Sequence, residues 1–202
     1  MKKIFGIILC LILIESVQAQ RDLQYKWSVT AEYGLCNLDG DGDSWIRQAF
    51  GASVEYAFLP FAGVSVDYYH FPLAGPTFTT QLNSADINFT LNINRLLFST
   101  TDYKVILKGY IGYGIAGYTS TYLSTPVSSR FSTYNSTTSF PVLAVSVEYY
   151  LNRFLSVGAK SQFRPFSVNN LEGDPRYNQD NVNTDNLVAA TLYLRVKFAR
   201  DN

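Results

Sequence analysis

The chain has 202 residues, with 16 basic side chains, 16 acidic side chains, one histidine and two cysteines. This length fits one domain, and the balanced charge argues against a nucleic-acid partner, which requires a clustered basic surface. Cys36 is the only cysteine beyond the export signal described next, which excludes an intrachain disulfide and a Cys/His metal site.

Residues 1–19 have the pattern of a secretory signal peptide. Lys2 and Lys3 precede an apolar run from Ile4 to Ile14, and Val17-Gln18-Ala19 fits the small-x-small cleavage pattern. The run is too short for a spanning helix. We therefore expect an exported domain over residues 20–202. Without Lys2, Lys3 and Glu15 it keeps 14 of the 16 basic and 15 of the 16 acidic side chains.

A two-residue alternation of apolar and polar side chains recurs along the rest of the chain. It is clearest in residues 87–93 and 188–198, where apolar residues alternate with Asn and Thr or with Thr, Tyr, Arg and Lys. Successive side chains of a strand point to opposite faces, so this period predicts strands rather than helices. The predicted strands cover residues 24–36, 45–59, 62–71, 84–95, 103–118, 139–150, 154–166 and 186–199.

The predicted connections alternate between long and short. Long connections are expected over residues 37–44, 72–83, 119–138 and 167–185, and short ones near Pro60, over 96–102 and near Asn152. An even strand number puts all the long loops at one end, as in outer-membrane barrels. The strands are also longer than the typical globular strand of about 5–6 residues. The sequence therefore predicts an all-β fold, an eight-stranded antiparallel up-and-down transmembrane β-barrel.

Three features together resemble the small eight-stranded outer-membrane β-barrel family typified by OmpA, OmpX and OmpW. They are the signal peptide, the run Gly109-Tyr110-Ile111-Gly112-Tyr113-Gly114, and the terminal strand from Leu192 to Phe198. The resemblance implies a location in the outer membrane of a Gram-negative bacterium. It also implies contact with outer-membrane lipid and with the barrel-assembly machinery, whose aromatic signal would be Phe198, here followed by four more residues.

Aromatic side chains on the apolar faces are candidates for the girdles that mark membrane interfaces. The predicted interfacial aromatics are Trp27, Tyr33, Tyr56, Tyr68, Tyr113 and Tyr149.

The polar faces carry charges that are sorted along the chain, mainly acidic on the early strands and mainly basic on the late ones. Arg47 is an exception among the early strands and Glu148 among the late ones. The interior of an eight-stranded barrel is just wide enough for side chains, and buried charges are costly unless paired. We therefore predict a luminal salt-bridge network, with Arg195 beside Glu32, formed by Glu32, Glu55, Asp67, Asp86, Lys104, Lys108, Glu148, Lys160, Arg164, Arg195 and Lys197.

Two further motifs are weaker. The aspartates Asp39, Asp41 and Asp43 resemble the start of a calcium loop, but Phe50 stands where the bidentate glutamate belongs, which favours a polar turn. His70 is the only histidine, and Asp67 is predicted to point to the opposite face. We therefore expect no enzyme activity, no metal site and no cofactor.

The sequence thus predicts an integral outer-membrane barrel with a charge-paired, closed lumen and a structural or surface-interaction role, with loops open to extracellular ligands. A narrow gated pore for small solutes is one alternative. A soluble exported barrel that binds a hydrophobic ligand, with the apolar face inward, is another.

Overall fold

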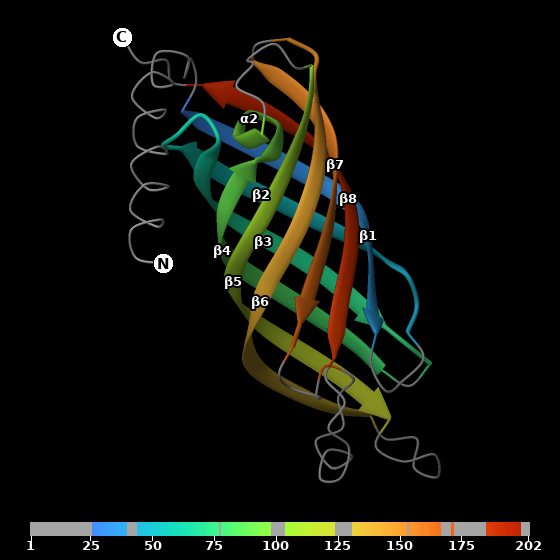
Figure 1. Ribbon diagram of the computed structural model, residues 1–202. Helices are drawn as coiled ribbons and strands as arrows, with labels where there is room; N and C mark the ends of the chain where they lie inside the picture. Colours follow the sequence, from blue (N-terminus) through green and yellow to red (C-terminus); the bar gives the residue numbers. More distant parts are fainter. Residues whose placement is uncertain are drawn as a thin grey trace, which may run out of the picture.

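The chain forms a closed barrel of eight antiparallel strands in which each strand pairs with the next and β8 pairs with β1 (Figure 1). This computed structural model describes residues 26–39, 44–76, 78–97, 104–123, 131–152, 154–166, 171 and 185–198. The strands are β1 Trp27–Asp39, β2 Arg47–Ala57, β3 Ala62–Ala74, β4 Phe78–Asn92, β5 Val105–Leu123, β6 Phe131–Tyr150, β7 Leu155–Pro165 and β8 Asn186–Phe198. The predicted eight-stranded up-and-down fold is confirmed.

Closure involves the whole length of the first and last strands, from Trp27 opposite Phe198 to Asp39 opposite Asn186. The start of β1, the end of β8 and the short helix α2, Ile93–Leu97, lie at one end of the barrel, which we call the α2 end (Figure 1). The opposite end, which holds the connections β1–β2, β3–β4, β5–β6 and β7–β8, is called the loop end.

The alternation in the sequence becomes an apolar outer wall and a polar inner wall. On β8 the outward side chains of Val188, Leu192 and Leu194 are 43%, 71% and 47% exposed, whereas the inward Thr191 and Arg195 are buried. The same pattern runs around the barrel on all eight strands. A wall of exposed β-branched, leucine and aromatic side chains is the surface that a membrane-spanning barrel presents to lipid.

Helix α2 replaces the predicted end of the fourth strand. The alternation at Ile93 and Asn94 predicts strand to residue 95, but β4 ends at Asn92. The side-chain oxygen of Asn92 accepts a hydrogen bond from the backbone N–H of Arg95 at 3.1 Å, which caps the first turn of the helix. Within the described part of the chain, no helix combines the length and the apolar character needed to cross a membrane.

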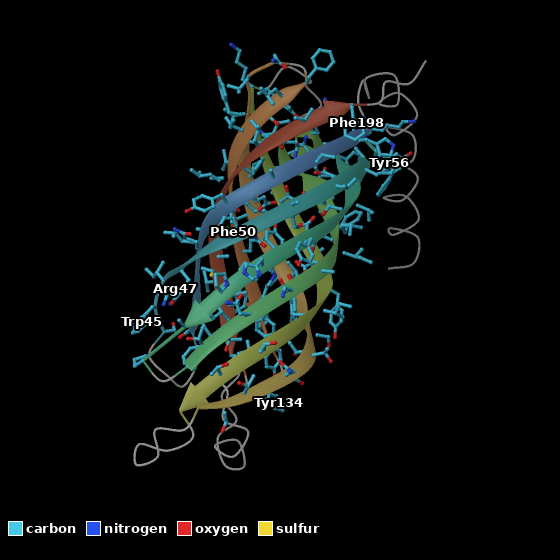
Figure 2. All side chains as sticks on the ribbon, turned by 180° about the vertical axis from the view of Figure 1, so that it is seen from behind. Trp45, Arg47, Phe50, Tyr56, Tyr134 and Phe198 are labelled. Carbon is cyan, nitrogen blue, oxygen red and sulfur yellow. The ribbon has the colours of Figure 1, made fainter. Side chains whose placement is uncertain are left out.

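Two loop predictions are wrong. Strands β3 and β4 extend to Ala74 and from Phe78, so their connection spans only residues 75–77. Strands β5 and β6 also extend into the predicted loop over 119–138, where Ser and Thr occupy both faces and give no apolar contrast. The resulting hairpin reaches beyond the other strands at the loop end, with Tyr134 near its tip (Figures 1 and 2).

Large inward side chains pack over glycines of the neighbouring strand and so fill the interior. A Cβ atom on Gly51 would lie 2.4 Å from the ring of Tyr69, which faces it in the register of β2 and β3. A Cβ atom on Gly158 would lie equally close, 2.4 Å, to the ring of Tyr193 on β8. Glycine is required at both positions because each large inward ring lies directly over the backbone of the next strand.

Candidate functional site

The structure places ten of the eleven predicted luminal charges on inward-facing positions. Nine are buried and Lys197 is partly exposed. The exception is Lys104, which lies one residue before β5 and is exposed, so its assignment to the lumen is corrected. Its position past the strand end frees its side chain from the inward alternation. The ten charges form three groups along the barrel.

The first group, nearest the α2 end, is the Glu148 cluster. Glu148 lies 2.8 Å from Arg195, 3.2 Å from Lys197 and 3.5 Å from Lys108. Glu55, from the opposite side of the barrel, lies 3.0 Å from both Lys108 and Arg195. Two carboxylates thus share three cations, and the pairs join β2, β5, β6 and β8 across the lumen.

The position of Arg195 differs from the prediction. Its Nε donates to the hydroxyl of Thr30 at 3.0 Å, and its Nη1 reaches Glu55 and Glu148 rather than Glu32. In the register of β1 and β8, Arg195 is opposite Thr30, two residues closer to the α2 end than Glu32.

The second group is the Lys160 cluster. The Nζ atom of Lys160 lies 2.9 Å from Asp67 and 3.4 Å from Glu32, and it donates to the hydroxyl of Tyr69 at 2.7 Å. The hydroxyl of Thr191 donates to the second carboxylate oxygen of Glu32 at 2.9 Å. This one lysine therefore joins β1, β3 and β7 through the centre of the barrel.

The third group is the Arg164 pair. Arg164 on β7 donates from Nη2 to Asp86 on β4 at 2.6 Å, and its guanidinium lies over the rings of Tyr69 and Phe71 at 4.4 Å and 4.7 Å. Arg164 is fully buried. Its Nε and Nη1 atoms and both amide atoms of Gln162 make no hydrogen bond to the described part of the protein.

An apolar cluster fills the lumen beyond Arg164 toward the loop end, and the sequence analysis did not predict it. Phe140 and Phe166 are its centre, with ring centroids 4.6 Å apart. Leu171 of the β7–β8 connection is buried in it, and its carbonyl accepts from Ser120 at 3.4 Å. The cluster consists of Cys36, Leu38, Ala49, Tyr69, Phe71, Leu73, Phe78, Leu82, Ala116, Tyr118, Phe140, Val142, Phe166, Leu171, Leu187 and Ala189.

A signal for the apolar cluster does exist in the sequence. Phe71 and Leu73 have the same parity on β3 as the inward Asp67, and Leu82 has the same parity on β4 as Asp86. Continuing the inward parity to the loop end of each strand would have shown that the inner face changes from charged to apolar.

The predicted interfacial aromatics all lie on the outer wall. Trp27 and Tyr56 contact each other near the α2 end, with ring centroids 4.8 Å apart, and Tyr149 lies one residue before the end of β6. The remaining three, Tyr33, Tyr68 and Tyr113, are more than half exposed and lie further along their strands. Phe198 is the last residue of β8 and is exposed beside Trp27 and Tyr56 (Figure 2).

The two weaker motifs do not converge on a site. Asp39 ends β1 and is exposed, while Asp41 and Asp43 lie outside the described residues, as does the predicted signal peptide. Among the described residues no three metal-binding side chains cluster. His70 faces outward, with Nδ1 2.8 Å from the side-chain oxygen of Asn83, whereas Asp67 faces the lumen.

The interior arrangement is neutral in charge and occupied along its length. Five acidic and five basic side chains lie in the three groups, and each has at least one ion-pair partner. Such pairing offsets the desolvation cost of buried charge. The apolar cluster adds a second, independent filling at the loop end.

The sequence matches the family described as outer membrane protein beta-barrel domain over residues 7–199. No curated protein matches it. Among solved structures, it is similar to Neisserial surface protein A, with 16% identity and a TM-score of 0.57, covering 85% of this chain and 97% of that one.

Two more solved structures are similar. A major outer membrane protein from Thermus thermophilus has 14% identity and a TM-score of 0.53, covering 85% of this chain and 99% of that one. Ail, the attachment invasion locus protein of Yersinia pestis, has 10% identity and a TM-score of 0.50, with coverage of 85% and 99%. At these identities the likeness concerns the fold alone.

Proposed function

The chain belongs to the outer membrane protein beta-barrel domain family, and on this premise we propose that it acts as a closed barrel with a structural and surface-interaction role. It neither conducts solutes freely nor catalyses a reaction. The observation that carries this proposal is the filled lumen. The Glu148 cluster, the Lys160 cluster, the Arg164 pair and the apolar cluster follow one another from the α2 end to the loop end.

The facing of the walls argues against a soluble barrel with a hydrophobic ligand. That alternative needs apolar side chains inward along the barrel and charges outward. Instead Ile111, Leu192 and Val145 are more than half exposed on the outside, and Lys160 and Glu148 are buried inside. Fractionation of membranes, together with a gel shift between heated and unheated samples, tests the export that the signal peptide predicts and the membrane insertion that the apolar outer wall predicts. A protein that stays soluble without detergent would contradict both.

Planar-bilayer recording tests the closed lumen. Purified protein inserted into a bilayer is expected to show no discrete openings. Replacing Phe140 and Phe166 by alanine removes the centre of the apolar cluster and leaves the ion pairs in place, so this variant is also expected to stay closed. Discrete openings of the unmodified protein would overturn the proposal.

A narrow gated pore is the second candidate, and one observation favours it. Lys108 and Arg195 each contact both Glu55 and Glu148, so partners can be exchanged without leaving any charge unpaired. A gate of this kind predicts openings after Lys108→Ala or Glu148→Ala. The absence of discrete conductance in the unmodified protein and in both variants would exclude the gate and support the closed barrel.

We place the surface-interaction role on the β5–β6 hairpin because its strands extend further at the loop end than the other described strands (Figure 1). Its described positions are rich in hydroxyl groups, including Thr121 and Thr133, whose Oγ1 atoms are 3.4 Å apart. A photo-crosslinking residue in place of Thr133, which is exposed on this hairpin, is expected to form protein adducts on intact cells. The same residue in place of the lipid-facing Tyr149 is the control, and equal adducts at the two positions would contradict the assignment.

A further inference from the structure

The outer wall carries an oblique row of small side chains. Following the strand register from β4 to β1, outward residues lie side by side, each opposite the next. The row consists of Leu91, Gly109, Val145, Ser161, Ala190 and Leu35. Three of these six residues are glycine, serine or alanine. The larger side chains of Ile111, Leu143 and Phe163 lie side by side along one edge of the row. Strands β5, β6 and β7, which carry the middle of the row, face the viewer in Figure 1, whereas β1 lies at the front in Figure 2.

Two hollows follow this row. One, of about 470 Å³, is lined by Leu91, Gly109 and Phe163, and the other, of about 670 Å³, by Leu35, Ala190 and Leu107. Both are lined by Val145 and Ser161, so they adjoin each other. We call the two together the furrow. A side chain on Gly109 would enter open space, because a Cβ atom there meets only the Cδ1 atom of Ile93, at 3.8 Å.

The furrow lies within the wall that faces lipid. Water is excluded at that depth, and a void without contacting atoms loses dispersion energy along its whole lining. The small side chains therefore leave room for an apolar chain from outside the protein. A lipid acyl chain fits this requirement, since the exposed lining of both hollows is almost entirely apolar.

Basic residues lie where the wall meets the α2 end. The β5 side of the furrow adjoins α2, through Ile93 and Gly109, and α2 carries Arg95. Lys104 lies one residue before β5 and is exposed. The structure records no ion pair between either residue and a described acidic side chain. The described acids at this end, Glu55 and Glu148, are buried in the lumen and already paired.

We propose that the furrow is a binding site for one anionic phospholipid, with an acyl chain along Gly109, Ser161 and Ala190 and the phosphate held by Arg95 and Lys104. The proposal rests on the membrane location of the family and not on the closed lumen. Its failure would therefore leave the bilayer recordings described above unaffected.

Native mass spectrometry of the purified, folded protein tests this site with two probes that share the same chains, dimyristoyl phosphatidylglycerol and dimyristoyl phosphatidylcholine. The unmodified protein is expected to retain one phosphatidylglycerol in preference to phosphatidylcholine. An attraction of roughly fivefold per basic residue near a membrane surface sets the scale of that preference. Equal retention of the two lipids by the unmodified protein would overturn the headgroup assignment.

Substitutions that fill the furrow test the binding site of the acyl chain. Gly109→Leu and Ser161→Leu, made separately so that either suffices if the other fails to fold, are expected to abolish retention of both lipids. Ala52→Leu is the matched control, because Ala52 is an exposed outward alanine on β2, outside the furrow. The double variant Lys104→Gln with Arg95→Gln is expected to remove the preference for phosphatidylglycerol while the acyl chain still binds in the furrow. Retention that is the same in the filled variants and in Ala52→Leu would overturn the site.

Discussion

Arg164 and Asp86 lie 2.6 Å apart and join β7 to β4, two strands that are not neighbours in the barrel wall. Both side chains are almost fully buried, and the arginine also lies over two aromatic rings. Removing one partner of a buried pair leaves an uncompensated charge. We expect Asp86→Ala to lower the free energy of unfolding by about 3–5 kcal/mol, measured by urea titration in lipid vesicles.

The double variant Asp86→Leu with Arg164→Met is the matched test of this pair. It removes both charges and keeps apolar volume, so most of the loss is expected to be recovered. Arg47→Ala is the control, because Arg47 is exposed at the loop end (Figure 2), and its effect is expected within about 0.5 kcal/mol. If the double variant were no more stable than Asp86→Ala, the pair would not be the source of the loss.

The two glutamates Glu148 and Glu32 are expected to differ in importance. Glu148 contacts three cations, so Glu148→Gln leaves excess buried positive charge, at a cost of about 3–5 kcal/mol. Among the described cations Glu32 pairs with Lys160 alone, and Lys160 keeps Asp67 as a second partner, so Glu32→Gln is expected to cost about 1–2 kcal/mol. Unfolding titrations of the two variants compare these values directly. Equal losses would show that the number of ion pairs does not set the cost.

The alternation in the sequence predicted well which side chains point into the lumen, but it predicted poorly which ion pairs they form. Lys108, Glu148 and Lys160 are buried on the inner wall, the face that strand parity alone predicts for them. The alternation did not predict that Arg195 reaches Glu55 instead of Glu32, because the height of a residue depends on strand register and on side-chain length.

The ends of the strands were the least predictable part. The alternation continued through Ile93, but the capping side chain of Asn92 favours a helical turn there. In the β5–β6 hairpin, Ser and Thr on both faces hide the period, although the strands pair as far as Leu123 and Phe131. Apolar residues such as Phe71 on the inner face contradicted the assumption that this face stays polar, so the apolar cluster was missed.

Close packing against a glycine gives a separate prediction. A Cβ atom on Gly51 would lie 2.4 Å from the ring of Tyr69, which cannot move away because its hydroxyl accepts from Lys160. We expect Gly51→Ala to destabilise the barrel by about 1–3 kcal/mol in the same titration. Gly117→Ala is the control, since no atom lies within 4 Å of the added Cβ, and it is expected to change stability by less than about 0.5 kcal/mol. A neutral Gly51→Ala variant would show that the interior is less tightly filled.

The lipid-facing wall is tested by charge at two depths on the same strand. Leu192 lies midway along β8 and is 71% exposed, whereas Phe198 ends the strand at the α2 end and is 45% exposed. In a membrane, Leu192→Arg is expected to cost about 2–4 kcal/mol, because the charge enters the hydrocarbon region, and Phe198→Arg about 0–1 kcal/mol, because it meets the interface. Urea unfolding in lipid vesicles measures both. A wall that faced water would show equally small effects at the two positions, so the difference between them reports the depth of the barrel in the bilayer.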